Sequence, residues 1–128
     1  MNPSIGTRVY SLLSANAAVA ARVATRIYPL IAPQTAAVPR IVYTNVDESH
    51  IRSLQGYTSG LIRDRVQVDC YAKTYAESET MADEVTDAFA SLPAVTLSPS
   101  RVGRASLYED ETQLFRVTMD FLLWITGA

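Results

Sequence analysis

The strongest constraint on the fold is a regular alternation of side chains between residues 112 and 126. From Phe115 to Ile125 every second residue is apolar, and only a β-strand places such residues on a single face. These residues are Phe115, Val117, Met119, Phe121, Leu123 and Ile125. The residues between them are mixed in polarity. A long strand with one apolar face must pack that face against another layer, so the sequence predicts a sheet covered on one side.

The covering layer is predicted to be helical. Thr74 and Glu77 have the spacing of a capping box, in which a hydroxyl and a carboxylate each bond a free backbone N–H at a helix N-terminus. Apolar residues then recur at helical spacing, at Met81, Val85, Ala88, Phe89 and Leu92. A first helix is predicted to begin with Asn2 as N-cap and Pro3 as its first residue, and a short helical piece follows over residues 17–23.

The remaining segments predict the rest of the sheet. Strands are expected at residues 26–30, 40–46, 62–72 and 101–108, and the polar, glycine-punctuated residues 47–60 are expected to form a long loop. The predicted fold class is α+β, with a mainly antiparallel sheet of about four to five strands and two main helices packed on one face. The 128 residues are expected to form a single domain, 1–128.

Charge is segregated along the chain. Residues 1–40 contain four arginines and no acid, whereas residues 74–92 contain five acids and no base. Two interpretations are open: the charges form solvated faces, or a basic and an acidic surface meet, within one subunit or between neighbouring subunits. On the second interpretation, the candidate inter-subunit charges are Arg22, Arg26, Asp83 and Glu84.

The sequence nominates no catalytic, cofactor-binding or metal-ligating residue. His50 is the only histidine and has no second His or Cys at ligand spacing, and Cys70 lies among apolar residues, as a buried and inert thiol does. We therefore expect no cofactor. With a net charge of −2 and no basic cluster with interleaved aromatics, sequence-specific nucleic-acid binding is not expected. No apolar run approaches the roughly 18 residues of a membrane helix, so no membrane partner is expected.

Several segments, in order and spacing, resemble one protein family. They are Arg26–Pro29, Pro39–Tyr43, Leu54–Gly60, Arg65–Tyr71 and Thr74–Glu77. Together they make the chain similar, over roughly residues 3–92, to the tail-completion, or tail-terminator, proteins of long-tailed bacteriophages and prophages. The resemblance implies a structural virion protein without catalytic residues, built as a single tail-terminator-like α+β domain.

The same resemblance implies partners and a location. Such subunits form a homo-oligomeric, hexameric ring at the head-proximal end of the tail, where the ring caps the tail tube and docks the head–tail connector proteins. It is assembled in the bacterial host cytoplasm, and DNA passes through the lumen. The predicted long loop supplies a candidate assembly loop with Arg52, Leu54 and Tyr57.

Two alternatives stay open at the level of sequence. One is another head–tail connector or tail-tube component of the virion. The other is a small-molecule-binding α+β domain, which would require a concave pocket with convergent polar groups.

Overall fold

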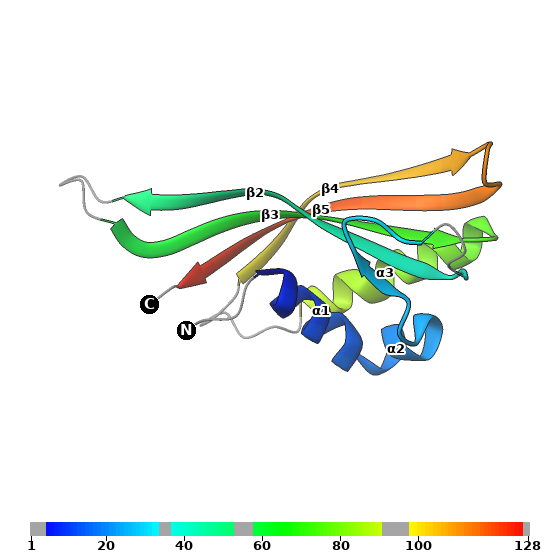
Figure 1. Cartoon of the computed structure of the whole chain (residues 1–128), viewed down its shortest axis with the longest axis horizontal. Coiled ribbons are helices and arrows are strands. Elements are labelled where there is room, and N and C mark those ends of the chain that lie inside the picture. Colours follow the sequence, from blue (N-terminus) through cyan, green and yellow to red (C-terminus); the bar gives the residue numbers. More distant parts are fainter. Residues whose placement is uncertain (1–4, 34–36, 53–57, 91–97, 127–128) are drawn as a thin grey trace.

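The computed structural model describes residues 5–33, 37–52, 58–90 and 98–126. The helices are α1 (Ile5–Ala15), α2 (Ala17–Val23) and α3 (Tyr75–Ala90). The strands are β1 (Ile27–Pro29), β2 (Arg40–Arg52), β3 (Thr58–Ala72), β4 (Ser98–Glu109) and β5 (Leu114–Thr126). All three helices lie on one side of a twisted sheet (Figure 1), so the predicted α+β class is confirmed.

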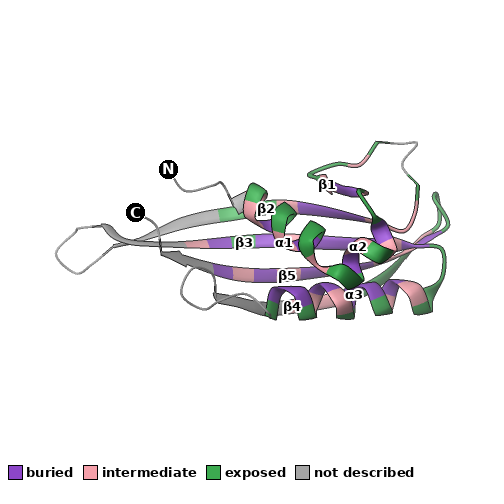
Figure 2. Ribbon diagram, turned by 90° about the horizontal axis from the view of Figure 1, so that it is seen from below, coloured by how far each residue is buried: buried purple, intermediate pink, exposed green. Residues whose placement is uncertain are grey.

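The sheet has five strands in the order β1-β2-β3-β5-β4. The short β1 pairs in parallel with β2, and the other neighbours are antiparallel. Strands β1 and β4 therefore form the two opposite edges of the sheet, as Figure 2 shows in plan. The hairpins β2–β3 and β4–β5 point to opposite ends of the molecule (Figure 1).

Two irregularities occur at one level of the sheet. The pairing of β2 with β3 shifts between Asn45 and Asp47, and the pairing of β4 with β5 shifts between Arg101 and Gly103. Asn45 pairs with Val66, Val66 with Phe121, and Phe121 with Arg101. Strands β2 and β4 thus each carry a β-bulge beside the same row, while β3 and β5 pair without interruption between them.

The core lies between the sheet and the helices. The predicted apolar face of β5 is confirmed for Val117, Met119, Phe121 and Leu123, which are all at most 1% exposed. Phe115 is only half-buried, and the side chain of Ile125 lies outside the described ones. Phe121 stacks on Phe89 of α3, with ring centroids 4.2 Å apart and planes at 16°. The other fully buried members come mainly from α1, α2, β3 and α3 (Figure 2).

Polar residues begin two of the helices. The Thr74 hydroxyl accepts a hydrogen bond from the Glu77 backbone N–H at 3.2 Å, which confirms half of the predicted capping box at α3. Helix α2 begins after Asn16, whose side-chain oxygen accepts a bond from the Val19 N–H at 3.1 Å. The N-cap predicted at Asn2 and Pro3 lies outside the described residues.

The predicted loop 47–60 was wrong over its whole described length. Residues 47–52 continue β2 and residues 58–60 begin β3, so the two strands form one long hairpin whose outermost described pair is Arg52 with Thr58. Polar side chains argued for a loop, but pairing across the hairpin satisfies the backbone and overrides that weak local preference. The remaining five residues of the predicted loop, 53–57, lie outside the described part of the chain.

Candidate assembly surface

Helices α2 and α3 are joined by an ion pair. Arg22 donates from Nε to Glu84 at 2.6 Å, and its guanidinium also lies 3.6 Å from Glu77. The side chains of Arg22 and Glu84 are only 27% and 22% exposed. The hydrogen bond to Glu84 raises the pKa of Arg22 above its ordinary value. The acidic helix and the basic first third of the chain therefore meet inside one subunit.

Arg104 of β4 joins the other flank of α3 to the sheet. Its guanidinium lies 2.5 Å from the Glu79 carboxylate and 2.8 Å from Asp83. The Ser106 hydroxyl also donates to Glu79, and this bond, together with Arg104, lowers the pKa of Glu79. The predictions from sequence did not assign a role to Arg104, because only the pairing of β4 with β5 brings it beside α3.

The four charges nominated from sequence all have partners within the chain. Arg22 and Glu84 bind each other, and Asp83 binds Arg104. Arg26 donates to the backbone carbonyls of Pro39 at 2.8 Å and Arg22 at 3.2 Å. Contact within one subunit was one of the two possibilities left open. A role for these charges between subunits stays a prediction, although pairing inside the chain already accounts for their segregation.

The face of the sheet opposite the helices carries a connected set of polar contacts. Asp69 accepts from Gln67 at 3.1 Å and lies 4.0 Å from the Arg116 guanidinium. Arg116 also lies 3.3 Å from Glu109 and donates to the Tyr71 hydroxyl at 3.5 Å, which raises the Arg116 pKa. This face is therefore a polar layer.

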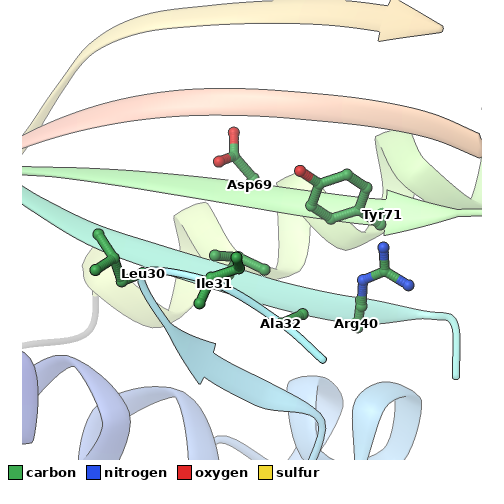
Figure 3. A pocket seen from close by; sticks show the side chains of 7 residues that line it. Leu30, Ile31, Ala32, Arg40, Asp69 and Tyr71 are labelled. Carbon is green, nitrogen blue, oxygen red and sulfur yellow. The ribbon is translucent and has the colours of Figure 1, made fainter. Parts of the chain in front are cut away.

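A pocket of about 220 Å³ opens at one end of this polar face. Its floor includes Asp69 and Tyr71, and the Arg40 guanidinium lies 4.8 Å from the Tyr71 ring centroid (Figure 3). The segment that follows β1 forms its wall with Leu30, Ile31 and Ala32 (Figure 3). Because this wall is apolar and open, the pocket continues into an exposed apolar surface.

A larger hollow of about 490 Å³ adjoins the turn between β4 and β5. Its described lining is four consecutive residues, 109–112, so among the residues that the structure describes, polar groups from different elements do not converge there. A ligand site is usually built by convergence of that kind. The hollow therefore gives no support to the small-molecule alternative.

Large apolar side chains are exposed at both edges of the sheet. Beside β1, Leu30 is 71% and Ile31 77% exposed. Beside β4, Tyr75 and Tyr108 are each 50% exposed, and their rings lie 6.2 and 4.9 Å from that of Phe115. The placement of Leu30 and Ile31 between Pro29 and Pro33 was an available sequence signal, since an apolar pair in a proline-bounded loop cannot join a helix or strand core.

The residues of the candidate assembly loop are only partly placed. Arg52 is the last residue of β2, at the far end of the long hairpin, and Leu54 and Tyr57 lie outside the described residues. His50, expected in a loop, belongs to β2 and pairs with Ile62. Cys70 is buried as predicted, and burial raises its thiol pKa.

Neither a metal centre nor a membrane span is found in the described parts of the chain. There, no group of three His, Cys, Asp or Glu residues could hold a metal ion. Among the described helices, none is long and apolar enough to cross a membrane.

Known proteins resemble this chain both in sequence and in fold. The sequence matches the family described as "Tail completion protein gp17" over residues 7–126. A chain of a solved structure titled "Virion of native gene transfer agent (GTA) particle" is similar in fold, with a TM-score of 0.72 at 20% sequence identity over 93% of this chain and 92% of that one. No curated protein matches in sequence.

Proposed function

Because this chain belongs to the tail completion protein gp17 family, we propose that it terminates the tail by forming a ring, with six subunits, that caps the tail tube. Membership makes it a structural protein of the virion tail. The observation that carries the proposal is the family match over residues 7–126, which spans every described strand and nearly all of the described helices. The ring joins the tube to the head–tail connector proteins and leaves a lumen for DNA.

Several features of the described surface support an assembly role without catalysis. The charged groups on both flanks of α3 pair with one another: Arg22 with Glu84, and Arg104 with Glu79 and Asp83. The first pair joins α2 to α3, and the second set joins α3 to β4, so these charges have a structural role. Most of the large exposed apolar side chains, in contrast, lie beside the sheet edges, where a neighbouring protein can cover them.

The long β2–β3 hairpin is proposed to contact the tail tube or a neighbouring subunit. It reaches beyond the helix-covered part of the sheet (Figure 1), and Arg52 lies at its far end. A projecting hairpin can enter a second protein without disturbing the core that holds its base. The candidate assembly loop therefore stays in the proposal. The paired strands β2 and β3 support it, where the sequence predicted a loop over residues 47–60.

Electron microscopy of the purified protein, alone and mixed with polymerised tail tubes, tests the proposal. Rings, or caps at one end of each tube, are expected. Particles that bind connector proteins but do not bind tail tubes would support the connector alternative instead. A strict monomer that binds neither would contradict any terminator role.

A hairpin variant tests the contact of the β2–β3 tip. Replacing residues 53–57 by a short Gly/Ser turn should leave the thermal unfolding curve close to that of the parent, because the change keeps every residue of the described core. Capping of tubes should be lost. Normal capping by the folded variant would remove the tip from the proposal.

A further inference from the structure

The two exposed apolar surfaces differ in shape and chemistry. We name Leu30 and Ile31 the aliphatic edge, and Tyr75, Tyr108 and Phe115 the aromatic corner. The aliphatic edge is more than 70% exposed at both residues, and the two tyrosines of the aromatic corner are half exposed. Surfaces of this kind on a soluble chain mark contacts with other proteins.

The backbone holds the aliphatic edge in place. The Leu30 N–H donates to the Tyr43 carbonyl at 2.7 Å, and the Ile31 N–H donates to the Pro29 carbonyl at 2.7 Å. Leu30 has a φ of 68°, a left-handed conformation that non-glycine residues rarely adopt. Two large aliphatic side chains are thus presented to solvent by a fixed and unfavourable turn, an arrangement that often accompanies a functional contact.

The two surfaces belong to opposite edges of one sheet. The aliphatic edge follows β1, and Tyr108 of the aromatic corner lies on β4, with the sheet order β1-β2-β3-β5-β4 between them (Figure 2). One copy can therefore offer both surfaces at the same time to two neighbours. Two different patches that meet head to tail generate a ring when the rotation closes.

Charge favours contact between unlike edges. Residues 1–46 contain four arginines and no acid, and Arg40 lines the same pocket as the aliphatic edge. Asp69 also lines that pocket, but it is buried and contacts Gln67 and Arg116. Beside the aromatic corner, the turn at the end of β4 carries three acids; Glu109 pairs with Arg116, and Asp110 and Glu111 are exposed. Two aliphatic edges would bring like charges together, whereas an aliphatic edge and an aromatic corner bring opposite charges together.

We propose that the aliphatic edge of one copy packs against the aromatic corner of the next, and that this single contact, repeated, closes the ring. Large aromatic rings are well suited to the centre of such a contact, with Arg40 and the acidic turn 109–111 at its rim. The inference rests on the proposed ring, but it concerns which surfaces meet and not whether a ring forms.

Paired variants test the contact. Variant A carries Leu30→Asn and Ile31→Ser, because Asn tolerates the left-handed backbone at residue 30. Variant B carries Tyr75→Ala and Tyr108→Thr, which suit a helix and a strand respectively. Tyr10→Ser is the matched control, since Tyr10 is also exposed, at 39%, but lies on α1. Thermal unfolding establishes that each variant is folded.

Self-association is then measured by sedimentation at high protein concentration and by subunit occupancy on tail tubes. Variants A and B alone should each associate at least about tenfold more weakly than the parent, and the control should match the parent. Mixed together, A and B should form a one-to-one dimer, because A keeps its aromatic corner and B its aliphatic edge.

The outcomes separate this inference from the proposed function. The inferred contact is wrong if the folded variants A and B form rings as the parent does. It is also wrong if the mixture remains monomeric while the parent forms rings. Neither result contradicts the proposed ring. If the parent itself neither forms rings nor caps tubes, both are wrong.

Discussion

The two faces of the sheet are made from alternate residues of the same strands and yet differ in how they are stabilised. On the helix-covered face, β5 contributes Met119 and Phe121, which are almost fully buried. On the other face, its neighbours Thr118 and Asp120 are partly exposed, and Asp120 pairs with Arg65 at 3.2 Å. Apolar burial contributes far more than exposed ion pairs. Stability is therefore concentrated on the helix-covered face, and the other face is left available for contacts.

The largest expected effect comes from the helix-covered face. Phe89→Ala removes the ring that stacks on Phe121 and leaves a cavity, which should cost about 3–5 kcal/mol of unfolding free energy. The melting temperature should fall by about 10–20 °C. Leu107→Ala, at a position 42% exposed, is the control and should change little. Equal melting curves for Phe89→Ala and the parent would mean that α3 does not cover the core as described.

A smaller loss is expected at the boundary of the covered face. Glu84→Gln leaves Arg22 without its main partner and should cost about 1–2 kcal/mol in urea unfolding. A substitution that reverses the charge of residue 84 would therefore destabilise the subunit itself, and its effect on assembly would not report on contacts between subunits alone. Asp87→Asn, an exposed neighbour on α3, should be nearly neutral. If both variants unfold at the same urea concentration, the Arg22–Glu84 pair contributes nothing to the fold.

The uncovered face should respond least to loss of a charge. Asp120→Asn disrupts the pair with Arg65, whose side chain is 49% exposed, and should cost less than about 1 kcal/mol. The measurement is the same urea titration. A cost equal to that of Phe89→Ala would break the contrast between the faces.

Acid should weaken the link between α3 and β4 slightly. The pKa of Glu79 is lowered from its ordinary 4.5 in the folded protein, first by the Ser106 hydroxyl and then by Arg104. The unfolded chain then binds the proton more tightly, so the contribution is complete above pH 4.5 and is lost as the pH falls through the folded pKa. Glu79→Gln should flatten this acid limb of a stability–pH curve. An unchanged limb would show that Glu79 titrates alike in both states.

The sequence predicted the covered face better than any other part of the molecule. The alternation in β5 and the helical spacing after Thr74 are local patterns, and the structure confirms both. The predicted end of β2 was wrong, because residues 47–52 are strand only through their long-range pairing with β3. The partners of Arg104 were likewise outside the reach of local reasoning, since they lie 21 and 25 residues away in sequence.

The bulge in β2 has a consequence for how this protein can change in length. Asn45 lies opposite Val66, and Asp47 lies opposite Arg65. The extra residue between them, Val46, therefore places Asn45 and Asp47 on opposite faces of the sheet, although residues two apart in a regular strand share a face. Deleting Val46 would remove the bulge but leave residues 47–52 opposite the same partners on β3, and therefore on the same faces of the sheet. Matched insertions or deletions of two residues in both strands of the hairpin, beyond the bulge, would keep every side chain on its face. The reach of the hairpin is therefore free to vary among relatives in even steps, without any change in the covered core.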